Sequence, residues 1–328
     1  MTKVEINGNL HLLKNKNMSP FETKKYREYR YKWEKYPAKE IVGRFPLHLD
    51  IEITSACNIK CPFCITTHAN FKNGLMEFET FKSIIDEGSE KGLYAIKMNW
   101  RGEPLIHPKI AEMTKYAKEK GILDVFTNTN ATLLTKEKSK SLIKAGMDRI
   151  IISFEGFEKE IYEANRVGAD FEETLANIND LMQAKKELKS RFPWVRVQTI
   201  LIDELKDKVG EYTEFWGEIV DEVACIDLKN EVGRVAVGES DWACPQLWQR
   251  MTIAWDGRIV PCVNDTFCKM CLGSVLEISV EETWKSEKME NMRDLHKKGL
   301  AHTIEDCLDC PLRSAQVIKE TSKGYIHT

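Results

Sequence analysis

Three cysteines on one short stretch are the residues of this chain best suited to chemistry. Cys57, Cys61 and Cys64 lie in the segment CNIKCPFC, with spacings of four and three residues. A structural zinc site needs four closed ligands, and His68 is the nearest candidate for a fourth. Three thiolates on a loop suit instead a cubane iron–sulfur cluster that leaves one iron open. An open iron can bind a second molecule, whereas a closed site only holds the fold together.

A second group of cysteines lies in the last quarter of the chain. Cys244 and Cys262 flank a predicted hairpin, and Cys307 and Cys310 form a CxxC turn. Four thiolates suffice for one saturated iron–sulfur cluster, although the spacing alone also allows a four-cysteine zinc site. The chain has 10 cysteines, and the three that remain unassigned are Cys225, Cys268 and Cys271. Cys268 is an alternative ligand of the second group, or Cys268 and Cys271 are free thiols.

The elements that must position these cysteines alternate between strand and helix from about residue 48. The predicted strands are 48–55, 95–100, 123–128, 149–154, 196–202 and 222–229. The predicted helices between them are 78–92, 109–121, 136–146, 171–188 and 209–220. This order predicts an α/β fold with a parallel sheet and crossover helices, either doubly wound or a partial barrel. A full barrel would need eight such units.

The pattern changes after about residue 240. Two short apolar runs in 252–261 surround Asp256 and Gly257, which predicts a two-residue hairpin turn. Residues 280–299 are expected to form one amphipathic helix that ends at Gly299. We therefore expect three parts: an N-terminal basic and aromatic extension (1–46), a barrel (47–235) and a small cysteine-rich domain with a tail (236–328).

The segment CNIKCPFC resembles the CxxxCxxC loop of the radical S-adenosylmethionine (SAM) superfamily. The resemblance implies a partial (β/α)6 barrel, a SAM-binding [4Fe–4S] cluster and S-adenosyl-L-methionine as cofactor. In that family the open iron chelates SAM, whose reductive cleavage yields a 5′-deoxyadenosyl radical that abstracts a hydrogen atom from substrate carbon. A reducing partner such as flavodoxin or ferredoxin is therefore expected.

Several further positions match the family motifs. Gly102 and Glu103 lie in RGEP, which resembles the GGE motif that meets the SAM amino group, with Arg101 in place of the first glycine. A carboxylate beside an ammonium group is electrostatically favourable. The remaining cofactor contacts implied by the resemblance are Phe63 for adenine, Asn128 for ribose, and Ser153 with Arg166 for the SAM carboxylate.

The C-terminal part resembles the twitch, or shortened SPASM, domain of some radical SAM enzymes. The shared features are the hairpin IAWDGRIVPC, the segment LGSV at 272–275, the helix with Trp284 and the final CxxC. The resemblance implies a second [4Fe–4S] cluster, the auxiliary cluster, on Cys244, Cys262, Cys307 and Cys310. A complete SPASM domain carries two auxiliary clusters, and the cysteines here favour one.

Side chains in a barrel strand alternate between the lumen and the helices. If Leu49, Ile51 and Ile53 face outward, Glu52 faces the lumen. The same reasoning in strand 222–229 places Ile226 and Leu228 outward, and three side chains in the lumen: Cys225, Asp227 and Lys229. Further lumen candidates are Glu155 and Gln198. We take Glu52 and Lys229 as candidate catalytic residues, and Cys225 as a candidate hydrogen donor, with a small buried hydrophobe as the alternative.

The composition and charge of the chain disfavour some classes of partner. The chain of 328 residues has 48 basic and 51 acidic side chains and a net charge of −3, which disfavours a general nucleic-acid binder. No apolar run approaches the ~18–20 residues that span a bilayer, and the first residues show no export signal, so we expect a cytoplasmic protein. Aromatic and basic residues alternate in 19–37, which is typical of an anion-binding patch or of an amphipathic helix packed on the barrel.

These features lead us to expect a radical SAM oxidoreductase, of dehydrogenase or epimerase type. Its expected substrate is a small polyhydroxylated molecule such as a sugar, nucleotide-sugar or aminocyclitol, because a polar lumen suits hydroxyl or amine groups. The alternative is a peptide-modifying maturase that forms thioether or carbon–carbon crosslinks, although few residues precede the barrel for leader recognition. A non-enzymatic iron–sulfur or RNA-binding protein would have no need for an intact cofactor site.

Overall fold

The computed structural model describes residues 21–226, 243–310 and 312–313, and the backbone of 5–7, 10–15, 320–321 and 324–325. Its core is a set of six parallel strands that pair in chain order. These strands are β3 (His48–Ile51), β4 (Ala95–Lys97), β5 (Asp124–Thr129), β6 (Arg149–Ser153), β7 (Trp194–Ile200) and β8 (Glu222–Ile226). All six predicted strands are present, and the partial (β/α)6 barrel is confirmed.

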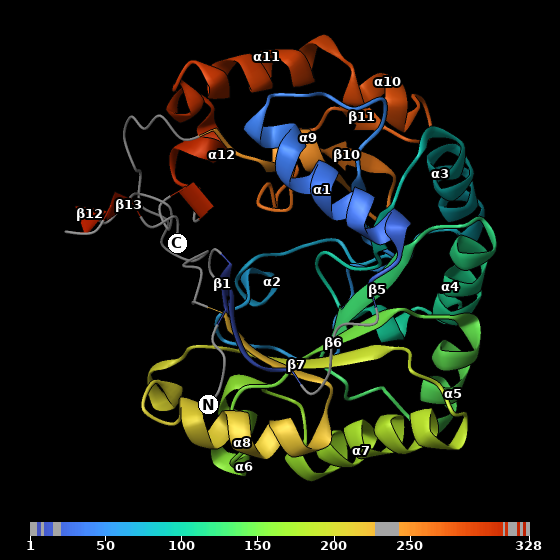
Figure 1. Ribbon diagram of the computed structural model, residues 1–328, viewed down its shortest axis with the longest axis vertical. Coiled ribbons are helices and arrows are strands. Elements are labelled where there is room, and N and C mark those ends of the chain that lie inside the picture. The colour runs from blue at the N-terminus through green and yellow to red at the C-terminus, as the bar shows by residue number, and fades with distance from the viewer. Residues whose placement is uncertain are drawn as a thin grey trace.

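Helices cover the outer face of the curved sheet and form an arc in Figure 1. They are α3 (Phe78–Lys91), α4 (Ile110–Glu119), α5 (Lys136–Ala145), α6 (Lys159–Asn165), α7 (Phe171–Glu187) and α8 (Val209–Ile219). The alternation in the first strand predicts that Leu49 and Ile51 face outward, and both belong to the apolar core beneath these helices. Gly92 ends α3 in the left-handed conformation, with φ of +92°, as the sequence predicts.

The sheet continues beyond the barrel at both edges and has eleven strands in the described part of the chain. On one side β2 (Leu10–Asn15) pairs antiparallel with β8, and β1 (Glu5–Asn7) follows it. On the other, β9 (Arg250–Ile253) runs parallel to β3, and β10 (Arg258–Val260) and β11 (Gly273–Ser274) extend the sheet antiparallel. The predicted hairpin is therefore confirmed, and its first strand also joins the barrel sheet. The expected boundary near residue 235 lies outside the described residues.

The C-terminal part adds short helices around this hairpin. They are α9 (Gln246–Gln249), α10 (Val280–Trp284), α11 (Glu287–Lys297) and α12 (Glu305–Leu308). The expectation of one helix over 280–299 is wrong, because Ser286 accepts a hydrogen bond from the Met289 amide and begins α11 as a new N-cap. Three 3-10 turns (Pro104–Ile106, Asp203–Leu205 and Ala301–Thr303) and a strand pair, β12 (Glu320–Thr321) with β13 (Gly324–Tyr325), complete the described elements.

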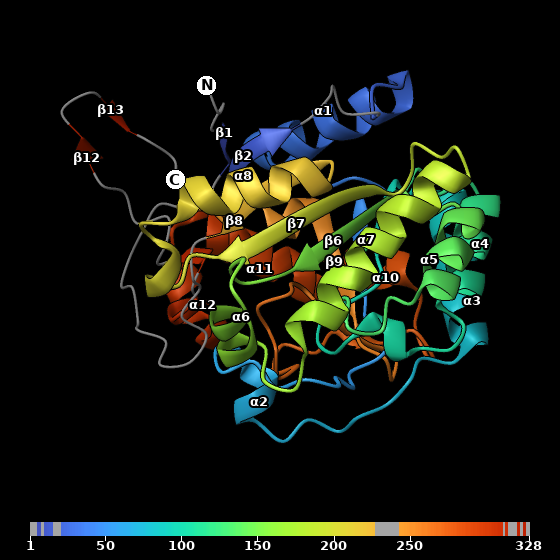
Figure 2. The ribbon, with the colours of Figure 1, turned by 90° about the horizontal axis from the view of Figure 1, so that it is seen from below.

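Helix α1 (Lys24–Ala38) lies across the end of the barrel where the strands begin. Tyr29 is buried there and stacks on Tyr94, with ring centroids 5.4 Å apart, while Tyr31 is 59% exposed. Helix α2 (Ile65–His68), which follows the three cysteines, lies at the opposite end in Figure 2. The aromatic segment is thus an amphipathic helix packed on the barrel, away from the cysteine loop. Within the described chain, every helix is too short or too polar to cross a lipid bilayer.

Candidate active site and auxiliary cluster site

A cavity of about 340 Å³ opens where the barrel strands end. It brings together residues from a loop after β3, a loop after β4, and the ends of β5, β6, β7 and β8. All three loop cysteines and all six predicted cofactor contacts line it: Cys57, Cys61, Cys64, Phe63, Gly102, Glu103, Asn128, Ser153 and Arg166. The sequence prediction therefore identifies positions that the fold gathers at one site.

The cysteine loop, residues 57–64, is held by backbone contacts. The amide of Lys60 donates to the carbonyl of Val167 at 2.9 Å, and the amide of Cys64 donates to the carbonyl of Cys61 at 3.1 Å. His68, the candidate fourth zinc ligand, is exposed, and its Nε2 lies 2.5 Å from the carbonyl oxygen of Pro62. The His68 ring thus contacts the backbone of the loop, and Cys57, Cys61 and Cys64 stay the predicted ligands of a cluster.

Arg166 links the cysteine loop to the fourth barrel strand. Its guanidinium forms two hydrogen bonds with the buried carboxylate of Glu155, and its Nη1 donates to Cys61 Sγ at 3.3 Å. Burial raises the pKa of the Cys61 thiol to about 11, while the Arg166 charge opposes that rise. A cation beside the sulfur stabilises the thiolate form that binds iron, so this environment fits a cluster ligand.

Gly102 and Glu103 line the cavity and pack against residues 54–56, which lead into the cysteine loop. Gly102 has φ of +70°, and a Cβ atom there would lie 2.5 Å from the Thr54 carbonyl oxygen, so only glycine fits. The Glu103 carboxylate accepts hydrogen bonds from the Thr129 hydroxyl and the Asn130 amide, each at 2.7 Å. Burial raises the pKa of Glu103, and these hydrogen bonds oppose the rise. A buried carboxylate with only neutral donors fits an incoming ammonium group.

Asn128 and Ser153 lie at the ends of β5 and β6. The buried Oδ1 atom of Asn128 has no hydrogen-bond partner among the described residues, which suits a ligand hydroxyl. Phe63 lies beside Arg166, whose guanidinium carbon is 5.5 Å from the ring centroid. Gln198 and Glu155 also line the cavity, as expected of lumen residues. The specific contacts of these side chains with SAM stay predictions.

The orientation expected for strand 222–229 is wrong. Ile226 lines the cavity, whereas Cys225 is 1% exposed and belongs to the apolar core beneath the helices. Parallel strands buried on both faces carry apolar residues on both, so the inward side cannot be chosen by polarity. Cys225 is therefore the small buried hydrophobe of the alternative, and its placement removes the basis for a hydrogen-donor role. Lys229 and Asp227 lie outside the described residues.

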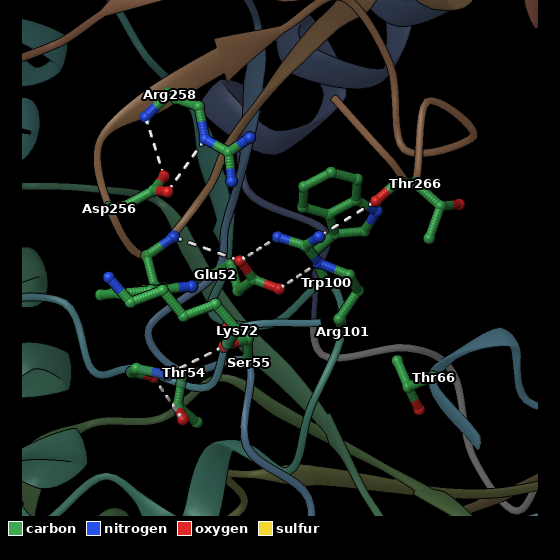
Figure 3. A network of polar contacts seen from close by, with 12 residues as sticks. Glu52, Thr54, Ser55, Thr66, Lys72, Trp100, Arg101, Asp256, Arg258 and Thr266 are labelled. Carbon is green, nitrogen blue, oxygen red and sulfur yellow. Dashed lines mark hydrogen bonds and ion pairs between the residues drawn. The ribbon is translucent and has the colours of Figure 1, made fainter. Parts of the chain in front are cut away.

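Glu52 does face inward, but it is fully buried. Both of its carboxylate oxygens accept hydrogen bonds from Arg101, each at 2.7 Å. The pair lies between the barrel and the C-terminal domain, where Figure 3 shows it beside Trp100 and Thr266. Any catalytic role of Glu52 must act through Arg101, which itself lines the cavity.

The four C-terminal cysteines come from three segments and line a second, smaller cavity. Cys244 precedes α9, Cys262 follows β10, Cys307 lies in α12 and Cys310 follows that helix. Burial, and then the neighbouring Cys310 sulfur, raise the pKa of Cys262 to about 12. No three His, Cys, Asp or Glu side chains in the described part of the chain converge as ligands of a single ion. Four thiols that line one small cavity provide the number of ligands that a saturated iron–sulfur cluster needs.

Polar groups also contact the sulfurs of this auxiliary site. His296 is buried, its Nδ1 accepts a hydrogen bond from the Cys244 amide at 3.1 Å, and its Nε2 lies 3.6 Å from Cys307 Sγ. Burial lowers the pKa of His296 to about 4, so the ring is neutral at pH 7. Since Nδ1 accepts, Nε2 carries the proton and donates toward the sulfur. Hydrogen bonds to ligand sulfurs tune a cluster's reduction potential.

Cys268 and Cys271 do not line the auxiliary cavity. Cys268 is 8% exposed, and burial raises the pKa of its thiol to about 11. Cys271 Sγ lies 3.4 Å from the carbonyl oxygen of Gly273. The described structure therefore supports the four-cysteine set over the alternative with Cys268.

Sequence comparison agrees with this geometry. The profile described as "Radical SAM superfamily" matches residues 51–211, and that described as "Iron-sulfur cluster-binding domain", SPASM, matches residues 244–311. The chain belongs to the radical SAM superfamily. Its SPASM domain carries the auxiliary site, and the family implies SAM, a SAM-binding [4Fe–4S] cluster and auxiliary iron–sulfur chemistry as its cofactors.

One protein similar over most of the chain comes from Pyrococcus furiosus and is described as a tungsten-containing aldehyde ferredoxin oxidoreductase cofactor-modifying protein. It is 24% identical over 319 residues, which cover 82% of this radical SAM chain and 88% of that protein. A GTP 3′,8-cyclase of Limosilactobacillus fermentum is 30% identical over 177 residues, 51% of this chain and 50% of the cyclase. The chain thus spans most of the first relative and about half of the second.

Two solved structures share the fold. BtrN in complex with AdoMet and 2-DOIA superposes with a TM-score of 0.57 at 17% identity, over 82% of this chain and 94% of BtrN. The protein anSMEcpe with bound AdoMet superposes with a TM-score of 0.60 at 17% identity, over 81% of this chain and 85% of that one. At these identities the similarity establishes the fold of this radical SAM chain.

Sequence reasoning missed part of the site. Asn99, Thr129 and Asn130 line the cavity, and the last two hold Glu103 in place. A signal was present, because β5 ends in a run of alternating Thr and Asn, and polar residues at the carboxyl ends of barrel strands are typical of active sites. The partnership between Glu52 and Arg101 had no signal in the sequence, since the two lie 49 residues apart.

Proposed function

We propose that this protein oxidises a carbon that bears a hydroxyl group in a small, uncharged or cationic polyhydroxylated substrate, such as a sugar or aminocyclitol. Bound at the cysteine loop, the cluster and SAM would supply the 5′-deoxyadenosyl radical that removes a hydrogen atom from that carbon. The substrate radical becomes a ketone by losing one proton and one electron. The auxiliary site, held by Cys244, Cys262, Cys307 and Cys310, would provide the electron acceptor.

The observation that carries this proposal is the charge balance of the cavity wall. Arg166 and Arg101 line the cavity, and each is paired with a buried carboxylate, Glu155 or Glu52. The described wall thus offers no uncompensated cation to bind a phosphate. Its other polar groups are largely neutral: Asn99, Asn128, Asn130, Ser153 and Gln198. Neutral donors and acceptors suit hydroxyl and amine groups better than phosphoryl groups.

The names of two relatives also favour a small molecule over a peptide as substrate. That of the Pyrococcus furiosus protein describes a cofactor-modifying protein, and that of the Limosilactobacillus fermentum protein describes a cyclase of GTP, whose phosphates distinguish it from the substrate proposed here. Oxidation is favoured over epimerisation because the thiol expected to return a hydrogen atom, Cys225, faces the helices rather than the cavity. With no thiol donor at that position, loss of an electron is the simpler fate of the substrate radical.

Isotope transfer tests the proposal. The reconstituted enzyme, SAM and dithionite would be incubated with aminocyclitols and free sugars deuterated at single carbinol carbons. We expect one substrate to yield a ketone and monodeuterated 5′-deoxyadenosine in equal amounts. Nucleotide-sugars and cysteine-containing peptides are the comparison sets. Deuterium transfer from a peptide, with none from any polyol, would establish the peptide-modifying alternative instead.

A further inference from the structure

One short segment lines the active-site cavity and also contacts the loop that follows an auxiliary-site cysteine. Residues 99–103 follow β4 and line the cavity, and the last two of them are the predicted contacts of the SAM amino group. The Trp100 indole Nε1 donates to the Val263 carbonyl at 2.7 Å, and Arg101 Nη1 donates to the Thr266 carbonyl at 3.0 Å. Residues 263–266, here called the auxiliary loop, begin directly after the auxiliary ligand Cys262.

Arg101 is fixed on every side. Its Nε and Nη2 donate to the two oxygens of Glu52, each at 2.7 Å, while its guanidinium carbon lies 4.2 Å from the Trp100 ring and 4.9 Å from the Phe71 ring. The exposed fractions are 7% for Arg101 and 0% for Glu52. A planar guanidinium can satisfy a carboxylate, a carbonyl and two ring faces together, which a lysine cannot.

Glu52 extends the contact to the hairpin. Its Oε2 also accepts a hydrogen bond from the Trp255 amide at 3.2 Å, in the turn between β9 and β10. Figure 3 shows the Arg101 guanidinium between the Glu52 carboxylate and Thr266, with the Trp100 ring alongside. The pair therefore holds the hairpin that leads to Cys262 and the loop that leaves it.

The auxiliary loop itself touches a second cluster ligand. Asn264 Nδ2 lies 3.7 Å from Cys310 Sγ, a distance suited to a weak hydrogen bond to sulfur. A shift of the auxiliary loop would thus move Cys262, to which the loop is covalently joined. It would also disturb Cys310, which Asn264 contacts. The position and the hydrogen bonding of the auxiliary cluster both depend on where residues 263–266 lie.

We propose that Trp100, Arg101 and Glu52 form a positioning bridge, which fixes the auxiliary cluster relative to the SAM-binding motif. These are positioning residues, because they act through the auxiliary loop. The inference rests on the auxiliary cluster and holds for any substrate, so it can fail or stand independently of the proposed oxidation. Arg101 takes the place where the family motif has a glycine, so the bridge distinguishes this chain from that motif.

The chain provides a matched control. Arg149 pairs with the buried Asp124, with Nε 3.1 Å from Oδ1, and its guanidinium carbon lies 4.1 Å from the Phe126 ring and 5.5 Å from the Phe21 ring. Both residues begin strands, β6 and β5, at the end of the barrel opposite the cavity. Arg149→Lys therefore disrupts a comparable arginine–carboxylate pair, whose arginine is partly buried, without touching the auxiliary loop.

The test compares Arg101→Lys, Glu52→Gln and Arg149→Lys by hydrogen–deuterium exchange of the reconstituted protein. We expect amide exchange in residues 263–271 to rise about fivefold or more in the first two variants and to stay at the wild-type rate in the third, because only the first two free the loop. Each variant is also built without Cys57, Cys61 and Cys64, so that the auxiliary cluster alone gives the electron paramagnetic resonance signal. Its g values and midpoint potential should shift with Arg101→Lys and not with Arg149→Lys.

Unchanged exchange in 263–271, together with an unchanged signal and potential in Arg101→Lys, would overturn the proposal. If Arg101→Lys does not yield folded protein, Trp100→Phe decides instead, because it keeps the ring and removes only the donor to Val263. The same exchange increase, about fivefold, is expected there from loss of one hydrogen bond. A wild-type exchange profile in Trp100→Phe would be equally contrary to the bridge.

Discussion

The two groups of metal-binding cysteines differ in what surrounds them. The cysteine loop shares a cavity of about 340 Å³ with amides, carboxylates and guanidinium groups, and Cys57 is exposed. The auxiliary site has four thiols where the loop has three, and Leu247, Met270 and Met292 line it together with polar residues such as His296. The first arrangement leaves room for a ligand on the metal, and the second does not. This difference agrees with the proposed division between a site that binds a reactant and a site that exchanges electrons.

The two groups also differ in how the chain assembles them. The three loop thiols lie within one segment of eight residues, anchored by the Lys60 to Val167 contact. The four auxiliary thiols come from both sides of a hairpin and from α12, and His296 of α11 contacts two of their residues. The loop can bind its cluster by local rearrangement, whereas the auxiliary site exists only once the domain has folded. We therefore expect the auxiliary cluster to contribute more to stability.

The largest effects come from removing one thiol from each group. Cys61→Ala should reduce cleavage of SAM to 5′-deoxyadenosine to the background level, because a loop ligand is lost. Cys307→Ala should keep SAM cleavage and lose the oxidised product, since the electron acceptor is disturbed. Chromatography of 5′-deoxyadenosine and product from the same reactions measures both. Equal loss of SAM cleavage in the two variants would contradict the division of roles.

A substitution of Glu103 tests whether the cavity at the cysteine loop binds SAM. Glu103→Gln should weaken SAM binding roughly 10- to 100-fold, because a hydrogen bond to a charged group contributes about 1.5–3 kcal/mol. Burial raises the pKa of Glu103, so wild-type affinity should fall as the pH is lowered toward that pKa and the carboxylate becomes protonated.

Isothermal titration of the reconstituted enzyme with SAM over a pH series measures both effects. The loss of affinity at low pH should be absent in Glu103→Gln, which has no proton to gain. The auxiliary cluster's absorbance gives an internal control, because Glu103 does not line the auxiliary cavity. An affinity loss on acidification that persists in Glu103→Gln would assign the titration to another group.

A moderate effect is expected from iron chelation. Reconstituted protein should hold about eight irons, and a chelator should first remove about four of them from the loop, where Cys57 is exposed and only three thiols bind. Saturating SAM should slow this first phase and leave the second unchanged. Iron release followed by absorbance, with and without SAM, gives the two rates. Faster release from the auxiliary site would contradict the burial argument.

The sequence predicts this fold well wherever local patterns determine it. Strand alternation predicts all six barrel strands, and residues such as Gly92 predict where helices end. Cysteine spacing predicts both metal sites. The break at Ser286 was missed, because an apolar periodicity that runs through both helices conceals a cap inside it. The pairing of Glu52 with Arg101 was missed for a different reason, since no local pattern encodes a contact between distant segments.

The smallest effect should come from Cys225, a thiol that belongs to neither metal site. It is 1% exposed in the apolar core, opposite Thr199 of β7, while the neighbouring Ile226 lines the cavity. Cys225→Ala should lower the free energy of unfolding by about 1 kcal/mol, from lost packing, and leave SAM cleavage and product formation within about twofold of wild type. Turnover in heavy water tests the point directly. We expect no solvent deuterium at the reacting carbon in either protein, and deuterium incorporation that disappears in Cys225→Ala would return this thiol to the active site.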